Sequence, residues 1–169
     1  MKKIIIILLF IGLIFPVTYI YGQGNGFEEK YREAGYTSIK NAKGTFEKHN
    51  KGNTNIPENL QDYLSFKSSH SFGQYNIQKS KDLRIEYVNK ESGEIFLILV
   101  YPKKSEIVFS KPEKTGEFKD GKGQYKSITE NNFSMFQFQS NKFSYILSSN
   151  SKSIKEEDFI KIANLIRNS

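Results

Sequence analysis

The chain has 169 residues, no cysteine, and 25 basic against 18 acidic side chains, for a formal net charge of +7. This length suits one globular domain. The absence of cysteine excludes disulfides, thiolate metal sites, iron–sulfur clusters and cysteine nucleophiles. Only two histidines, His49 and His70, remain for metal or general-base chemistry. We therefore expect no metal, no cofactor and no catalytic residue, and a non-enzymatic role.

Residues 1–24 are typical of a secretory signal. Two lysines precede an apolar run at 4–15, which Pro16 ends, and Gly24 and Gly26 provide cleavage positions. The alternative is an uncleaved membrane anchor, because the 18 residues 4–21 approach the length needed for a bilayer core of about 30 Å. In both cases the remainder is exported, to the extracellular face of the cytoplasmic membrane or as a secreted protein.

The exported part keeps 23 basic and 18 acidic side chains, a net charge of +5. The abundant Lys, Asn, Ile and Ser indicate AT-rich coding and a low-GC Gram-positive bacterium. Its nearest anions are phospholipid headgroups and wall polymers. Expected partners are therefore an envelope protein, an anionic membrane or wall component, or a lipid, and not nucleic acid.

Periodicity predicts helices in the segment 25–54, after a flexible glycine-rich joint at 22–26. Phe27, Tyr31 and Ala34 are spaced for one short helix. Residues 38–49 continue the helical pattern, and the Asn- and Gly-rich stretch 50–59 is expected to be a loop. We interpret 25–54 as a helical or linker segment that precedes the main domain at 55–169.

Strand patterns dominate the main domain from about Phe72 onwards. Residues 83–88 alternate in polarity, which predicts a half-buried strand, whereas 94–101 is apolar throughout and predicts a strand covered on both faces. A shorter apolar piece occurs at 106–109. Further strands are expected at the following ranges: 115–118, 124–128, 133–139 and 143–148. The predicted sheet is an antiparallel meander of about six strands.

The C-terminal segment predicts a helix with a recognisable start. Ser153 followed by Glu156 has the spacing of a capping box. An apolar stripe then recurs at helical spacing and is expected to pack on the sheet; its members are Phe159, Ile162, Ala163 and Ile166. The fold class is therefore α+β, with a C-terminal helix on the sheet and one or two N-terminal helices.

Three segments resemble the DUF4367 family, a domain of unknown function in exported or membrane-anchored proteins of Bacillus-like bacteria. They are LSFKSSHSFG at 64–73, LRIEYVN at 83–89 and SIKEEDFIKIANLI at 153–166. The resemblance spans roughly 55–168 and rests on a strand, a turn and a capped helix. It implies an interaction or regulatory domain of the cell envelope, in the context of sensing or sporulation.

Two other features are candidates for function. Seven lysines alternate with four acids between 103 and 126, and we expect a solvated hairpin that could also hold an anionic surface weakly. They are Lys103, Lys104, Lys111, Lys114, Lys119, Lys122 and Lys126. We expect His49 and His70 to be surface or loop residues, because neither has neighbours at metal-ligand spacing.

Aromatic side chains along the strands form the other candidate site. They are either a core beneath the N-terminal helices or a curved face for a hydrophobic ligand or a partner: Phe96, Tyr101, Phe136, Phe138, Phe143 and Tyr145. The leading hypothesis is a non-catalytic interaction module. The alternative is a lipid carrier or sensor. An enzyme, the third hypothesis, requires a pocket that gathers His70, a carboxylate and a hydroxyl.

Overall fold

The computed structural model of the chain describes residues 26–75, 78, 81–102, 114–118, 121–128, 133–140 and 142–169. For 114–118 and 121–128 it describes the course of the backbone. Three sequence expectations lie outside the described residues: the signal or anchor at 1–24, the apolar piece at 106–109, and Lys103, Lys104, Lys111 and Lys119 of the lysine-rich stretch.

The described residues form an α+β fold, as the sequence predicts. Its helices are α2 (Phe27–Glu33), α3 (Ile39–Asn50), the short 3-10 helix η2 (Leu60–Tyr63) and α4 (Glu156–Asn168). Its strands are β1 (His70–Gln74), β2 (Leu83–Val88), β3 (Ile95–Pro102), β4 (Lys114–Phe118), β5 (Gly121–Ile128), β6 (Phe133–Ser140) and β7 (Phe143–Ser149). They make a seven-stranded antiparallel sheet, one strand more than the approximate prediction.

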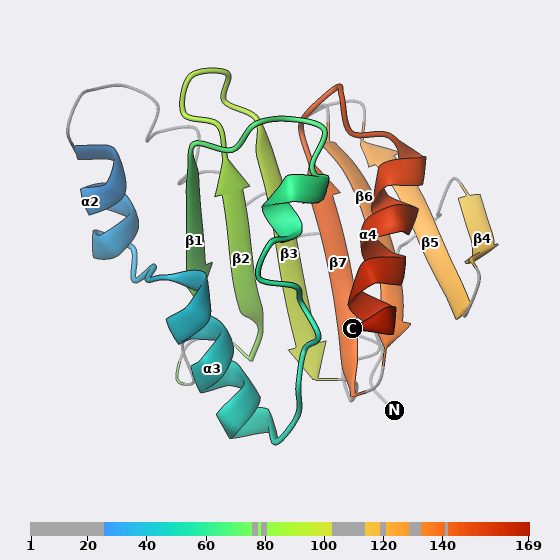
Figure 1. The fold of residues 1–169 in the computed structure, drawn as a ribbon, viewed down its shortest axis with the longest axis horizontal. Coiled ribbons are helices and arrows are strands. Elements are labelled where there is room, and N and C mark those ends of the chain that lie inside the picture. The colour runs from blue at the N-terminus through green and yellow to red at the C-terminus, as the bar shows by residue number, and fades with distance from the viewer. Residues whose placement is uncertain are drawn as a thin grey trace.

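The order of strands corrects the predicted simple meander. The sheet runs β1-β2-β3-β7-β6-β5-β4, so β3 pairs with β7 rather than with the strand that follows it in the chain (Figure 1). β3 and β7 are buried along most of their length. Pairing them places the most apolar segments inside the sheet and leaves β1 and β4 at its edges.

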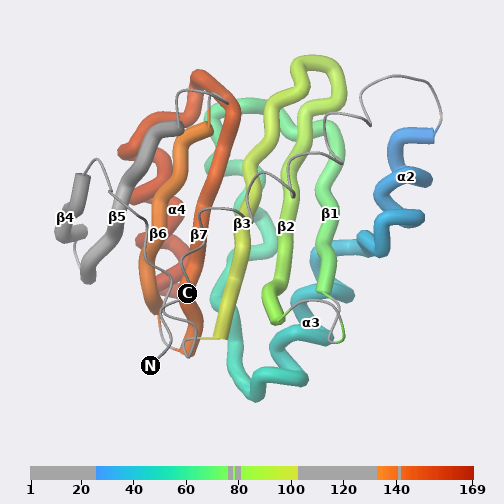
Figure 2. Tube along the Cα trace, turned by 180° about the vertical axis from the view of Figure 1, so that it is seen from behind, coloured from blue at the N-terminus to red at the C-terminus, as the bar shows by residue number. Residues whose placement is uncertain are grey.

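The main core lies between the sheet and the helices α3 and α4, which cover the same face (Figure 1). The predicted stripe of α4 is buried there, with Phe159 stacked on Phe96 at a ring-centroid distance of 5.8 Å. Seen from behind, α2 lies beyond the edge formed by β1 (Figure 2). The prediction that α4 packs on the sheet is confirmed.

Gly73 allows α3 to approach β1 closely. A Cβ atom at this position would lie 2.8 Å from the Cβ of Ala42 and 2.9 Å from the Cα of Ile39. Only glycine fits such an approach without a shift of the helix. Ser38 caps α3 by accepting a hydrogen bond from the Asn41 amide at 3.2 Å. The start of α3 is therefore fixed against the edge strand.

Two local expectations are wrong. β2 is buried on both faces rather than half-buried, because Arg84 pairs with Glu86 and Glu86 accepts hydrogen bonds from Tyr31 and Tyr36. Ser153 is not the cap of α4, which begins one residue after Lys155. The Lys155 amide instead donates to the Asp158 carboxylate at 2.8 Å, so the cap lies two residues later than the sequence indicates.

Candidate functional site between α2 and the edge of the sheet

A pocket of about 570 Å³ lies between α2 and the outer edge of β1. Helix α2 contributes Glu28 and Arg32, and β1 contributes its first residues. The connection 36–38 closes the pocket at one end. The volume is within the range of about 300–1,000 Å³ that is typical of ligand sites. The pocket is thus built by α2, β1 and the connection from α2 to α3.

His70 stands at the centre of the polar contacts in this pocket. Its Nδ1 atom lies 2.8 Å from the Ser69 hydroxyl, and its Nε2 atom lies 3.5 Å from a carboxylate oxygen of Glu28. The imidazole therefore bridges β1 and α2. The structure thus adds the distant carboxylate of Glu28 to a histidine and a hydroxyl that are neighbours in the sequence.

Ser69 also has a structural task. Its hydroxyl accepts a hydrogen bond from the Lys90 amide at 2.9 Å and lies within donating distance of the Val88 carbonyl at 3.2 Å. These contacts attach the start of β1 to the turn after β2. The hydroxyl has one proton, which cannot serve Val88 and His70 at the same time.

Aromatic rings form the wall behind the pocket. Tyr31 of α2 stacks on Phe72 of β1 with ring centroids 3.9 Å apart and an interplanar angle of 9°. Phe27 contacts the His70 ring at 5.0 Å, and Tyr36 meets Tyr31 edge-on at 5.0 Å. Such contacts stabilise beyond the area they bury. They hold α2 at the edge of the sheet.

A buried ion pair lies directly behind this wall. Arg84 Nε is 2.8 Å from a carboxylate oxygen of Glu86, and the two residues are 8% and 1% exposed. Tyr36 donates to the same oxygen at 2.5 Å, and Tyr31 donates to the other oxygen at 3.0 Å. Glu86 thus receives hydrogen bonds from Tyr31 within α2 and from Tyr36 just after this helix.

The electrostatics of this network favour its present protonation states. Burial raises the pKa of the Tyr36 phenol far above its ordinary value, and the charge of Glu86 raises it further. Burial is the largest single effect on Arg84 and lowers its pKa, but Glu86, Tyr36 and Asp82 together outweigh burial and raise the pKa. Burial also raises the pKa of the Asp82 carboxyl. Tyr36 therefore acts as a hydrogen-bond donor throughout the physiological range.

The edge of β1 is only partly paired. Thr37 and Gly73 exchange two main-chain hydrogen bonds, of 2.7 and 2.8 Å, as an isolated antiparallel bridge. Because main-chain groups alternate along a strand, Ser71 also directs its N–H and C=O away from β2. Ser71 is exposed and lines the pocket. The pocket therefore borders an open stretch of sheet edge.

The aromatic side chains singled out in the sequence lie elsewhere. Five of them belong to the main core and are at most 3% exposed: Phe96, Phe136, Phe138, Phe143 and Tyr145. Tyr145 also donates to the Thr54 carbonyl at 2.7 Å. Tyr101 lies on the opposite face, partly buried beside a small apolar cluster of Leu97, Leu99, Met135 and Ile146. Neither described pocket includes any of the six.

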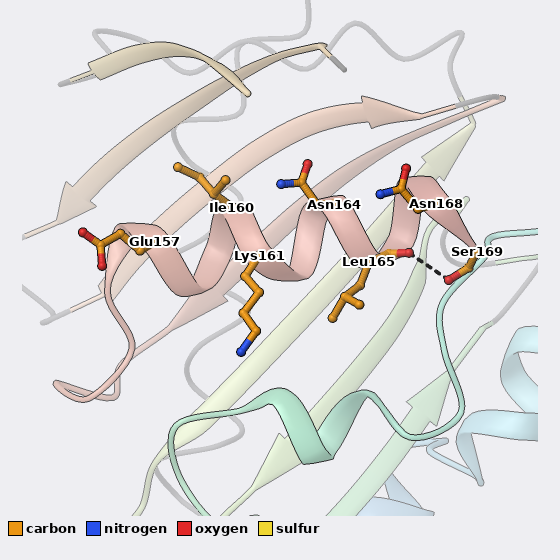
Figure 3. A pocket seen from close by; sticks show the side chains of 7 residues that line it. All are labelled: Glu157, Ile160, Lys161, Asn164, Leu165, Asn168 and Ser169. Carbon is orange, nitrogen blue, oxygen red and sulfur yellow. Dashed lines mark hydrogen bonds between the residues drawn. The ribbon is translucent and has the colours of Figure 1, made fainter. Parts of the chain in front are cut away.

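A second hollow of about 500 Å³ lies on α4. Its lining comes from the outer side of this one helix, with Glu157 at one end and Ser169 at the other (Figure 3). Ser169 donates to the Leu165 carbonyl at 2.8 Å. Among the described residues, no second element contributes to its lining, in contrast to the pocket between α2 and β1.

The two histidines have different surroundings. His49 is exposed on α3, and its ring centroid lies 6.1 Å from that of Tyr75. His70 lines the pocket and contacts two polar side chains. Within the residues described here, no group of three acidic or histidine side chains is placed to hold a metal ion. In the same ranges, no helix has both the length and the apolar character to cross a membrane.

Comparison with known proteins yields no matching family model, no matching curated protein and no matching solved structure. The resemblance to the DUF4367 family therefore stays a prediction.

Sequence reasoning missed the residues that build the pocket. Glu28 and Arg32 look like solvated charges on a short helix, and Glu86 looks like the polar side of a half-buried strand. The available signal was the choice of tyrosine at 31 and 36, since a buried tyrosine needs a partner for its hydroxyl. That signal does not identify the partner.

Proposed function

We propose that this chain is an exported, non-catalytic interaction module whose recognition site is the pocket between α2 and β1. The observation that carries the proposal is the construction of this pocket. Arg32 and Ser71 are exposed in the pocket beside the stacked rings of Tyr31 and Phe72. The Tyr31 hydroxyl bonds to the buried ion pair of Arg84 and Glu86, which fixes the position of these rings. Rigid support behind exposed polar groups is what a binding site requires.

Three further points support a protein partner in the envelope. The signal-like segment at 1–24 favours export, and the resemblance to DUF4367 implies an envelope setting. The pocket mixes aromatic and polar side chains and borders an open strand edge, which suits recognition of another chain. The five core aromatics are buried in the main core and offer a lipid no surface, so they do not support the carrier hypothesis.

Site-directed photo-crosslinking in intact cells of the bacterium tests the proposal. A photoreactive amino acid at Arg32 or Ser71 should yield an adduct with one envelope protein. The matched control is Lys161, which is exposed on the outer side of α4. Equal adducts from all three positions, or none from the first two, would contradict the proposal.

The contacts of His70 favour hydrolysis as a second candidate function. Ser69 would attack an ester carbonyl and pass its proton to His70 Nδ1, with Glu28 on Nε2. The imidazolium would protonate the departing alcohol, and water would then hydrolyse the acyl-serine. The bonds from Ser69 to the Lys90 turn weigh against this role. Labelling with a fluorophosphonate tests for a reactive serine. Modification of Ser69 that disappears in His70→Ala would support hydrolysis, and an unlabelled protein would contradict it.

A further inference from the structure

We propose that the partner enters the pocket as an extended peptide segment that pairs with Ser71 of β1 through its main chain and places an acidic side chain on Arg32. This inference rests on the proposed function and specifies the chemistry of the partner. It requires an open strand edge, space beside it, and a side chain that selects the peptide.

The open edge follows from the pairing of Gly73. Its N–H and C=O bond to Thr37 on the outer side of β1, at 2.8 and 2.7 Å. Two residues earlier, Ser71 presents the same pair of groups in the same direction. A strand that continued from Thr37 would meet Ser71 at residue 39, but α3 begins at Ile39. The outer main-chain groups of Ser71 therefore have no strand partner in this connection, because the chain changes from extended to helical at this point.

The protein itself shows that this edge accepts a strand. The bridge between Thr37 and Gly73 is one residue pair of antiparallel strand addition. A peptide on Ser71 would repeat that geometry one step along the edge. Addition of a strand to an exposed sheet edge is a common mode of peptide recognition, in which the main chain supplies affinity and side chains supply specificity.

Space for the peptide lies where the pairing requires it. The pocket of about 570 Å³ is bordered by Ser71 on the sheet side, by Ser38 at one end and by Arg32 on the helix side. Phe72, the next residue along β1, also lines the pocket, and its ring stacks on that of Tyr31. The hydroxymethyl group of Ser71 is small, so it leaves the approach to its own main chain open.

Arg32 supplies the charge that selects the peptide. Its side chain is exposed at the pocket and forms no ion pair with a carboxylate among the described residues. The neighbouring acid in the pocket, Glu28, faces His70. A guanidinium group binds a carboxylate through two parallel hydrogen bonds, which makes it selective for Asp or Glu. An extended peptide with an acidic residue therefore complements this pocket.

A peptide selection with matched variants tests the inference. The full chain in detergent micelles is presented to a phage library of random heptapeptides, and the affinities of the selected peptides are measured by fluorescence anisotropy. Ser71→Pro removes the outward N–H but no bond to β2, a position where an edge strand tolerates proline. Ser71→Ala is the matched control because it keeps the main chain intact.

The expected result is a set of acidic peptides that bind the native chain and Ser71→Ala alike. Their affinity should fall at least tenfold in Ser71→Pro and in Arg32→Ala. Unchanged affinity in Ser71→Pro would overturn the pairing, and a set of peptides without acidic residues would overturn the role of Arg32. A selection that yields no peptide would overturn the whole inference, while the photo-crosslinking from Arg32 and Ser71 would still decide the proposed function.

A second measurement keeps the test valid if Ser71→Pro fails to fold. Amide hydrogen exchange in the native chain reports directly on Ser71, whose N–H points away from β2. Binding of a selected peptide should slow exchange of the Ser71 amide at least tenfold and leave that of Gly73, already bonded to Thr37, nearly unchanged. Equal exchange of the Ser71 amide with and without peptide would overturn the inference.

Discussion

The two faces of β2 are built on different principles. On one face Leu83, Ile85 and Tyr87 join the core beneath α3 and α4, where apolar area and shape provide the stability. On the other face Arg84 and Glu86 are also buried, but they are held by an ion pair and two tyrosine hydroxyls. Both faces exclude water, and only one of them is apolar.

The two faces therefore have different roles, one in the stability of the domain and the other in the position of α2. Removing two charges from water costs several kcal/mol per ion, so a buried ion pair adds little net stability. What the pair does provide is orientation, because the Tyr31 and Tyr36 hydroxyls reach Glu86 in a single arrangement of α2. The apolar face stabilises the domain, and the charged face fixes the walls of the pocket between α2 and β1.

High pH should have the largest effect on stability, because buried tyrosines lie on both faces of the sheet. Burial raises the pKa of Tyr87 to about 12, and it also raises the pKa of Tyr36, Tyr101 and Tyr145. The folded state therefore favours the neutral phenols. This stabilising contribution is complete below the unfolded pKa of about 10 and is lost as pH rises through the folded values.

We expect cooperative unfolding in alkaline solution above pH about 10. Absorbance at 295 nm, which reports phenolate, should rise in step with the loss of circular dichroism for these buried tyrosines. A smooth titration near the ordinary pKa with unchanged circular dichroism would show that the phenols are accessible in the folded state.

Phe159→Ala should have the largest effect among single substitutions. The ring is fully buried on the core face and stacks on Phe96. Its loss leaves a cavity between α4 and the sheet, and we expect the free energy of unfolding to fall by about 4 kcal/mol. Urea denaturation measures this, with Glu157→Ala on the exposed side of the same helix as the control. A loss below about 1.5 kcal/mol would mean that the core collapses around the gap.

Glu86→Gln tests the opposite face. It removes the carboxylate charge 2.8 Å from the buried Arg84 guanidinium, and the free energy of unfolding should fall by about 3 kcal/mol. The exposed Glu91→Gln in the following turn is the control. If both changes have the same small effect, the ion pair is not desolvated, and the distinction between the two faces fails.

Replacing all four polar residues of the charged face tests whether this face contributes position rather than stability. The apolar set is Tyr31→Phe, Tyr36→Phe, Arg84→Met and Glu86→Leu. Because an apolar group of similar volume often replaces a buried ion pair without loss, we expect stability within about 1.5 kcal/mol of the native chain. Binding of the selected peptides should nevertheless weaken, since α2 loses the bonds that orient it. Intact binding would mean that the ring contacts alone position α2.

The sequence predicted what local pattern determines. The strands at 83–88 and 94–101 and the stripe of α4 follow from the apolar spacing of neighbouring residues. It did not predict the pairing of β3 with β7, in which Phe96 lies opposite Ser149. Contacts at such separations depend on the whole arrangement of strands and leave no local periodicity.

The candidate site was missed for the same reason. The hydroxyl of Tyr31 reaches Glu86 across 55 positions in the chain. On its own strand, Glu86 has the alternation of a solvent-facing residue, so the pattern favours exposure. Only the arrival of α2 and its tyrosines makes burial of this carboxylate possible. Buried polar residues are thus identified by their partners and not by their neighbours in sequence.

The start of α4 offers the smallest expected effect and the clearest contrast between sequence and structure. The Asp158 carboxylate accepts the Lys155 amide, so Asp158→Ala should lower the free energy of unfolding by about 1 kcal/mol. The Ser153 hydroxyl lies 2.7 Å from that of Ser151, outside the helix, and Ser153→Ala should cost less than about 0.5 kcal/mol. Thermal unfolding of the two variants side by side measures the difference. A larger loss in Ser153→Ala would mean that Ser153 caps α4, as the sequence indicates, and that the helix begins earlier than Glu156.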